Sequence, residues 1–116
     1  MVVDELSDTE VDRIFQALAD ATRRDILNRT MRAEESVSAL ARRYSMSFAA
    51  VQKHVAVLER ASLVTKQRRG REQLVQGNAE TLRRAARLLE VYEQIWRDRV
   101  DRIGDILSEP AKGMEK

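Results

Sequence analysis

Apolar residues recur at helical spacing in two stretches near the start of the chain. In the first stretch they fall at i, i+3, i+4 and i+7, which places them on one face of a helix. These residues are Val11, Ile14, Phe15 and Leu18. Ser7 or Thr9 can cap this helix, and Asp20 can cap a second one that ends near Arg32. The spacing therefore predicts helices one and two over residues 9–32.

Two further helices follow, and a short break separates them. The segment 35–44 predicts a helix of about two turns that is opened by a serine cap and packs through Val37 and Leu40. Residues 45–47 interrupt the pattern, and Ser47 can cap a new helix over 48–61. The inward face of this helix carries Val51, Val55 and Leu58 at i, i+4 and i+7. Two short helices joined by a turn of three or four residues are typical of a helix-turn-helix, which we place over residues 36–62.

The second helix of this motif carries small and polar residues on its outer face. These are Phe48, Ala49, Gln52, Lys53 and Ala56. Small side chains at the start of a helix allow close approach to DNA, and Gln52 and Lys53 can donate hydrogen bonds to base edges or phosphates. A polar helix face is more often plain solvated surface, so the helix-turn-helix context is what favours DNA.

Two short runs of β-branched and alternating character come next, over 63–67 and 72–76. They predict a hairpin over residues 63–77, with Gly70 supplying the positive φ of a tight turn. Arg68, Arg69 and Arg71 would lie at its exposed tip. Guanidinium groups suit phosphates and the narrow minor groove, so this wing is expected to contact DNA, although an ordinary charged hairpin tip has the same composition.

The C-terminal part of the chain predicts one long helix over residues 78–109, capped by Asn78 and ended by Pro110. At 1.5 Å per residue, such a helix is roughly 45 Å long, which is more than its own domain can cover. Its apolar stripe therefore predicts a homodimer, with packing against helix one as the alternative for part of the stripe. The residues of this stripe expected at the dimer interface are Leu82, Leu89, Tyr92, Trp96 and Ile103.

Composition narrows the class of protein. The 116 residues are 43% hydrophobic and 34% charged, which predicts a single globular domain over residues 1–116. Segment 36–77 holds eight basic and two acidic residues although the net charge of the chain is only +2, so we expect a polyanionic partner that meets the middle of the chain. The sequence shows no membrane span and no signal peptide, which predicts a cytoplasmic protein with no membrane partner.

The residue types also argue against catalysis and metal binding. The chain has one histidine, His54, and no cysteine, so it offers no thiolate ligand and no disulfide. It has no glycine-rich phosphate loop, and its carboxylates follow helical-surface spacing. We therefore expect a protein that is not an enzyme, holds no metal and needs no cofactor.

Three segments together resemble the ArsR-type regulators. The segment 15–27 (FQALADATRRDIL) is similar to their "ALADPTRRxIL" opening, with Ala21 in place of the usual proline. The segment 47–58 (SFAAVQKHVAVL) resembles their "SQPAVSxHLxVL" recognition helix, and Ala61-Ser62-Leu63-Val64 stands for "AGLV". The hairpin and the last helix with Trp96 fit as well, so the resemblance covers roughly residues 13 to 107.

The resemblance implies a mainly α fold with a small β-hairpin: a winged helix-turn-helix of about five helices, a two-stranded wing and a long C-terminal dimerisation helix. It implies a homodimer built from the first and last helices, which binds a palindromic operator in double-stranded DNA with recognition helices about 34 Å apart. Val11, Ile14 and Phe15 of the first helix are therefore also expected at the dimer interface. By motif position the residues facing DNA are Ser47, Phe48, Ala49, Gln52, Lys53 and His54. Phe48 stands where glutamine is common and offers apolar contact in place of hydrogen bonds.

The resemblance also implies a repressor released by an effector. Where metal-sensing members have "CVC", this chain has Ser36-Val37-Ser38, and hydroxyls are poor ligands for soft metals. The sequence leaves three alternatives open: a regulator that answers to a small organic effector, a constitutive DNA-binding protein, or a winged-helix dimer that binds another protein and no DNA.

Overall fold

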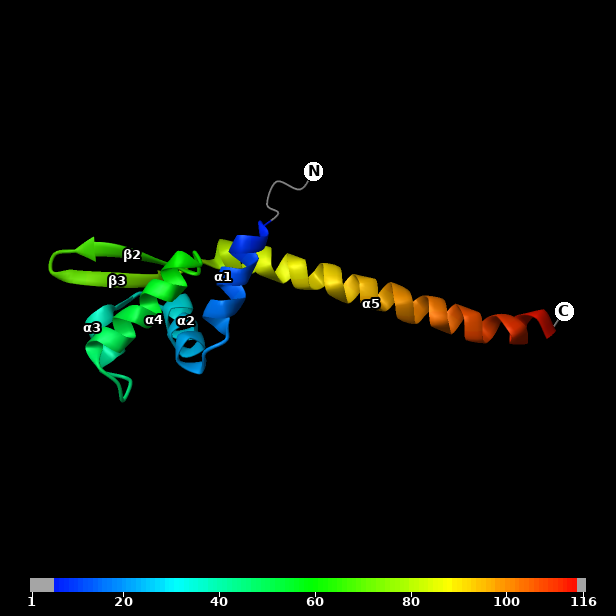
Figure 1. The fold of residues 1–116 in the computed structure, drawn as a ribbon, viewed down its shortest axis with the longest axis horizontal. Helices are drawn as coiled ribbons and strands as arrows, with labels where there is room; N and C mark the ends of the chain where they lie inside the picture. The colour runs from blue at the N-terminus through cyan, green and yellow to red at the C-terminus, as the bar shows by residue number, and fades with distance from the viewer. Residues whose placement is uncertain (1–5, 115–116) are drawn as a thin grey trace. The chain divides into compact units, whose positions relative to one another are not determined.

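The protein has five helices and a small antiparallel sheet in a computed structural model, which describes residues 6–114 and the side chains of residues 6–108 (Figure 1). The elements are α1 (Asp8–Leu18), α2 (Ala21–Arg32), β1 (Glu35–Ser36), α3 (Val37–Ala41), α4 (Phe48–Arg60), β2 (Val64–Arg69), β3 (Glu72–Gly77) and α5 (Ala79–Met114). They form two compact units, residues 1–85 and 86–116. The predicted fold class, mainly α with a winged helix-turn-helix, is confirmed.

Polar side chains cap the N-termini of α1, α2, α3 and α4, as the sequence predicts. The Ser7 hydroxyl accepts from the backbone N–H of Glu10, and the Glu10 carboxylate accepts from that of Ser7, which makes a capping box at α1. The side chains of Asp20, Ser36 and Ser47 cap α2, α3 and α4, each by accepting one hydrogen bond from the backbone N–H three residues on. These local bonds explain why the starts of the helices can be read from sequence.

The prediction for α3 was wrong in length. The helix ends at Ala41, and the turn before α4 spans residues 42–47, which is longer than the three or four residues expected. The backbone N–H of Arg43 bonds three residues back to Leu40, a 3₁₀ pattern that tightens the last turn and ends the helix. The sequence also missed β1, because a strand of two residues shows no alternation of side chains.

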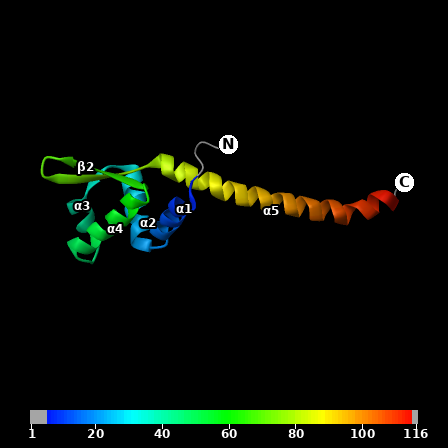
Figure 2. The same ribbon diagram turned by 45° about the horizontal axis from the view of Figure 1, so that its top comes forward.

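The hairpin of β2 and β3 ends at Gly77 as predicted, but β2 begins one residue later than the predicted run 63–67 and extends two residues closer to the turn. Arg68 and Arg69 lie within β2 and pair with Gln73 and Glu72, so Gly70 and Arg71 alone form the turn. Gly70 has φ +65, and Arg71 does not have a positive φ, which is typical of a type II′ turn. β1 pairs with the other edge of β3, giving the order β1-β3-β2. The hairpin extends past the helices at one side of the first unit (Figure 2).

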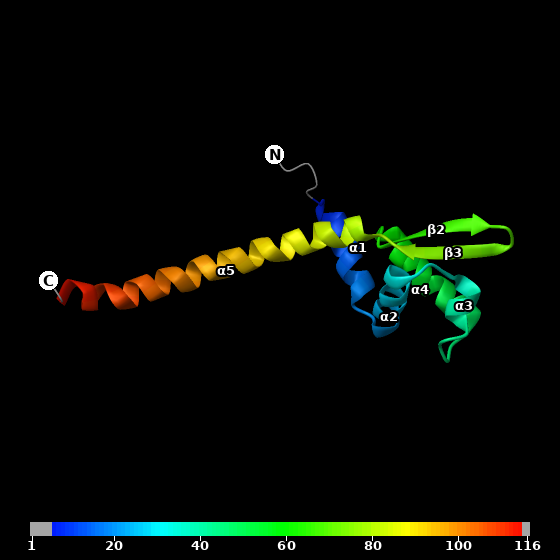
Figure 3. The ribbon, with the colours of Figure 1, turned by 180° about the vertical axis from the view of Figure 1, so that it is seen from behind.

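A single apolar core holds the first unit together. Its members with no more than 1% exposure include residues from α1, α2, α3, α4 and both long strands: Ile14, Ala17, Ile26, Leu40, Val51, Val55, Leu58, Leu63, Val64 and Val75. α4 packs on α2 and on α3, and this arrangement can be followed from behind in Figure 3. The inward stripe of α4 fixes which of its faces remains exposed.

The long helix α5 runs through both the weak position Gly104 and Pro110, and the prediction that Pro110 ends it was wrong. A proline removes one N–H donor and crowds the preceding turn, which weakens a helix without necessarily ending it. Asn78 accepts a hydrogen bond from the N–H of Glu80 at 3.1 Å at the start of the helix. Within the described residues no helix is both long and apolar enough to span a bilayer.

Candidate nucleic-acid interface

The first turns of α4 present side chains that the fold itself does not use. Phe48, Ala49, Gln52 and Lys53 are exposed, and Ser47, which precedes the helix, caps it by accepting from Ala50 N–H at 3.1 Å. The side chains of Gln52 and Lys53 make no hydrogen bond or ion pair with any described residue. This exposed surface is called the α4 face below. Its donors are free to bind a partner.

His54 lies on a different side of α4 from these residues. It is half-buried, and Arg23 Nη1 of α2 donates to its Nδ1 at 3.3 Å, which requires the neutral tautomer with the proton on Nε2. Asp20 Oδ2 lies 3.9 Å from the same nitrogen. The histidine therefore joins α4 to the start of α2.

Arg23 is a residue whose role the sequence did not reveal. Its guanidinium also donates to the carbonyls of Ala17 and Gln16 at 2.9 Å each, and so ties the end of α1 to α2 and α4. Its backbone N–H donates to Asp20, which is the main reason that the pKa of the Asp20 carboxyl lies below its usual value. The only sequence signal for this role is the Arg23-Arg24 pair in the opening motif.

The turn before α4 is held by a second polar cluster. Tyr44 donates to Asp25 Oδ2 at 2.5 Å, and Arg29 donates to the same oxygen at 2.9 Å. The Tyr44 bond, followed by the Arg29 bond, lowers the pKa of Asp25. Burial and the bond to Asp25 raise the pKa of Tyr44 to about 12. The cluster connects the turn to α2, on which α4 also packs.

The three arginines of the hairpin differ in their partners. Arg69 Nη1 lies 3.3 Å from Glu34 Oε1, whereas Arg68 and Arg71 make no ion pair with any described residue. Lys66, farther from the turn, pairs with Glu59 of α4 at 3.4 Å and links the hairpin to that helix. Arg68 and Arg71 are thus the wing residues with free guanidinium groups.

The turn before α4 adds basic residues that were not among the predicted site residues. Arg42 and Arg43 are both exposed, and Arg43 pairs with Glu35 at 3.0 Å. The local excess of basic residues is the sequence signal that could have found them. They extend the positive charge at the start of α4.

The residues expected at a dimer interface differ in how much of each is exposed. Ile14 is 1% exposed, so it belongs to the core of its own unit and offers no surface to a second copy. Val11 and Leu82 are half-buried, and Phe15 is partly exposed. On α5, the remaining four are about half exposed: Leu89, Tyr92, Trp96 and Ile103.

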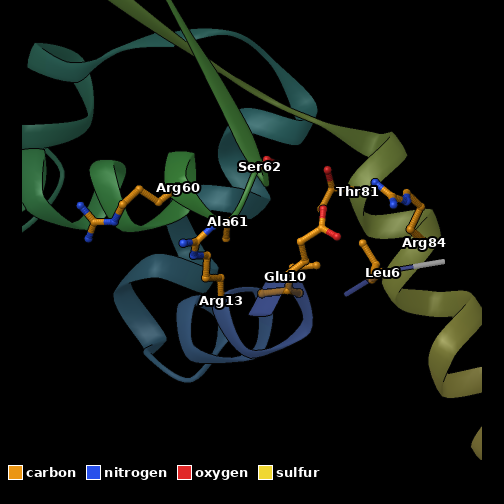
Figure 4. A pocket seen from close by; sticks show the side chains of 9 residues that line it. Leu6, Glu10, Arg13, Arg60, Ala61, Ser62, Thr81 and Arg84 are labelled. Carbon is orange, nitrogen blue, oxygen red and sulfur yellow. The ribbon is translucent and has the colours of Figure 1, made fainter. Parts of the chain in front are cut away.

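A shallow pocket of about 90 Å³ lies near the other end of α4 (Figure 4). Its lining comes from α1, the end of α4 and the start of α5: Leu6, Glu10, Arg13, Ile14, Arg60, Ala61, Ser62, Thr81 and Arg84. Hydrogen bonds from Ser7 lower the pKa of Glu10, with smaller contributions from Arg84 and Arg13. Among the residues with described side chains, no group of three or more histidine or acidic residues could hold a metal ion.

Comparisons with known proteins agree with this architecture. A family model for a helix-turn-helix domain matches residues 18–67, and no curated protein matches the chain. An ArsR-like transcriptional regulator from Rhodococcus sp. RHA1 is 36% identical, with 84% of this chain and 92% of that chain covered and a TM-score of 0.76. Another solved ArsR family transcriptional regulator is 29% identical, covering 80% and 96% with a TM-score of 0.75.

A third similar structure is a homodimeric winged helix-turn-helix DNA-binding domain from Mycobacterium bovis, a possible ArsR-family regulator. It is 25% identical, with 81% of this chain and 92% of that chain covered and a TM-score of 0.61. Together with the exposed face of α4 and the basic wing, these likenesses confirm the resemblance seen in the sequence. The chain belongs to the ArsR family of winged helix-turn-helix transcriptional regulators, a family of DNA-binding proteins.

Proposed function

We propose that the chain is a homodimeric repressor that binds a palindromic operator in duplex DNA and senses no metal. The observation that carries this proposal is the α4 face: four exposed side chains, two of them unpaired donors, at the start of a helix whose other side is buried. In a helix-turn-helix the first residues of the second helix are the ones that reach base edges.

Within the α4 face, Gln52 and Lys53 have different roles. A glutamine carboxamide can bond an adenine edge through two hydrogen bonds, so Gln52 discriminates between sequences. The Lys53 ammonium is a point charge that suits phosphate and adds affinity for any duplex. His54 acts through its bond to Arg23 and holds the helix in register with α2.

The wing supplies contacts that do not depend on sequence. Arg68 and Arg71 have free guanidinium groups, and Arg69 can exchange Glu34 for a phosphate because their ion pair is solvent-exposed. Each phosphate contact releases a counterion, so this part of the binding weakens with salt.

The α5 residues of the second unit favour a dimer. Nine of the large apolar side chains described on this segment are exposed, and eight of them fall within an arc of about 140° on a helix of 3.6 residues per turn, whereas Val91 lies outside it. The eight are Leu89, Tyr92, Ile95, Trp96, Val100, Ile103, Ile106 and Leu107, all at least 44% exposed. A stripe of this size left in water is unfavourable, and a second copy of the helix covers it. The homodimeric M. bovis relative supports the same assembly.

The third-helix position used by metal sensors is occupied by Ser36 and Ser38. The Ser36 hydroxyl accepts from the Ala39 N–H at 3.0 Å and is 8% exposed, so it is committed to capping α3. Hydroxyl oxygens are also poor partners for soft metals. These features support repression without metal sensing.

The second candidate is a winged-helix dimer that binds another protein. Such a dimer requires the fold and the α5 stripe. It does not require the unpaired Lys53 or the basic residues of the wing, and their presence therefore favours DNA binding. Capture of genomic fragments with the purified protein, followed by fluorescence anisotropy on the best fragment at several salt concentrations, separates the two. Enrichment of a palindromic site with a steep salt slope supports the repressor. No enrichment at any salt favours the protein-binding module.

The sign of regulation needs a transcription assay on the captured fragment. Purified protein should lower transcript yield from a promoter that overlaps the site, and a Gln52→Ala protein should lower it less. Gln94→Ala removes the same carboxamide from α5, where Gln94 donates to Asp98, and serves as the matched control. Increased transcription with wild-type protein would contradict a repressor.

A further inference from the structure

Phe48 is an exposed aromatic ring at the position where a recognition helix meets DNA. It is the first residue of α4, directly after the Ser47 cap, and it is 48% exposed. The other exposed large apolar side chains described in residues 6–85 are Phe15 and Met31, at 37% and 38%, and neither belongs to α4. The ring does not belong to the core of the first unit, so packing within that unit does not account for an aromatic side chain at this position.

The surroundings of the ring limit what it can recognise. Ala49, the exposed neighbour, contributes only a methyl group, and Gln52 follows one turn later on the same face. A phenyl ring can neither donate to a phosphate nor read the hydrogen-bonding groups of guanine, adenine or cytosine. Burying its exposed surface requires an apolar group on the partner.

In the major groove only thymine presents such a group, its 5-methyl, and phenylalanine is one of the side chains that contact it. We propose that Phe48 packs against the 5-methyl group of a thymine at a fixed position in each half of the operator. This inference rests on the proposed function and makes Phe48 a specificity-determining residue. Gln52 then reads a base by hydrogen bonds one turn farther along the helix.

The first test is selection of binding sites from a random duplex library by the wild-type protein and by Phe48→Ala. The wild type should select sites with an invariant thymine at one position of each half-site, and Phe48→Ala should accept any base there. A Phe48→Leu protein keeps an apolar side chain and should still prefer thymine. Circular dichroism checks that each variant is folded.

The second test removes the methyl group alone. Replacing that thymine by deoxyuracil should weaken wild-type binding about fourfold per half-site, since a methyl-sized group is worth about 0.8 kcal/mol when buried. The same replacement should leave Phe48→Ala unaffected. Putting 5-methylcytosine in place of cytosine at that position should strengthen wild-type binding by a similar factor.

Three outcomes would overturn the assignment. Equal sensitivity of wild type and Phe48→Ala to deoxyuracil would move the methyl contact to another residue. Operator binding with no sensitivity to deoxyuracil would mean that Phe48 reads no methyl group, and a sharp bend in the bound DNA would then make it a wedge between base steps. If no duplex is selected by either protein, the proposed function itself fails.

Discussion

The Tyr44 hydroxyl donates a hydrogen bond of 2.5 Å to the Asp25 carboxylate, and this bond joins the turn before α4 to α2. Because Arg29 shares the same oxygen, the carboxylate stays ionised and its acceptor strength is high. The turn sets where α4 begins, so the bond positions the α4 face without belonging to it.

Removal of this hydroxyl should lower stability. Tyr44→Phe is expected to reduce the free energy of unfolding by about 1.5 kcal/mol, the lower end of the range for a hydrogen bond to a charged group. Urea denaturation followed by circular dichroism measures the change. Ser45→Ala removes an exposed hydroxyl of the same turn that bonds no described residue, and it should leave the midpoint almost unchanged.

The same pair predicts a pH dependence with a definite sign. Folding raises the pKa of Tyr44 from 10.0 to about 12, so the stabilisation is complete below the unfolded value and is lost as the pH rises through about 12. The stability difference between wild type and Tyr44→Phe should therefore shrink across this interval. A difference that does not change with pH there would contradict the assigned bond.

Ser62 gives an opportunity to stabilise the protein. It follows α4 with φ 61, and the bonds from Ser62 N–H to Glu59 and from Leu63 N–H to Leu58 form a Schellman motif. Ser62→Gly should raise the free energy of unfolding by about 0.5–1 kcal/mol, because the strain of a left-handed serine exceeds the added flexibility of the unfolded chain. Ser62→Ala keeps the strain and should show no gain.

Gly77 at the end of β3 has no room for a side chain. A Cβ built there would overlap Met31 Sδ and lie 3.1 Å from Met31 Cα. Gly77→Ala should cost about 1–3 kcal/mol of stability, typical of overpacking. Thermal unfolding of Gly77→Ala and of the double variant with Met31→Ala tests this, since the smaller residue at position 31 should recover part of the loss.

The wing arginines should control the salt dependence of DNA binding. Arg69→Ala combined with Arg71→Ala should weaken binding to operator and random duplexes alike, and should reduce the salt slope by about 0.9 for each phosphate that the variant no longer neutralises. Anisotropy at several salt concentrations measures both effects, with Arg97→Gln as the charge control. Unchanged affinity and slope would show that the wing does not touch DNA.

The α5 stripe should control assembly. Trp96→Asp places a charge among exposed apolar side chains and should convert the dimer to a monomer in light scattering. Gln94→Glu adds a negative charge about half a turn away on the same helix and should leave the dimer intact. A dimeric Trp96→Asp protein would move the interface elsewhere.

Local signals account for most of what the sequence predicted correctly. The caps at Ser7, Asp20, Ser36 and Ser47 act within three residues of themselves, so the starts of four helices follow from the chain alone. The inward stripe of α4 follows from spacing in the same way, and with it the exposure of Gln52 and Lys53.

Contacts between residues far apart in the sequence decided which predicted site residues are paired or buried. Arg23 donates to His54 on another side of α4, Ile14 is buried in the core, and Glu34 pairs with one of the three wing arginines. The sequence by itself therefore determined the family, where the first four helices begin and which face of α4 is exposed. The tertiary structure alone decided which polar side chains on that surface remain unpaired, because pairing depends on distances between residues that lie about 30 positions apart in the chain.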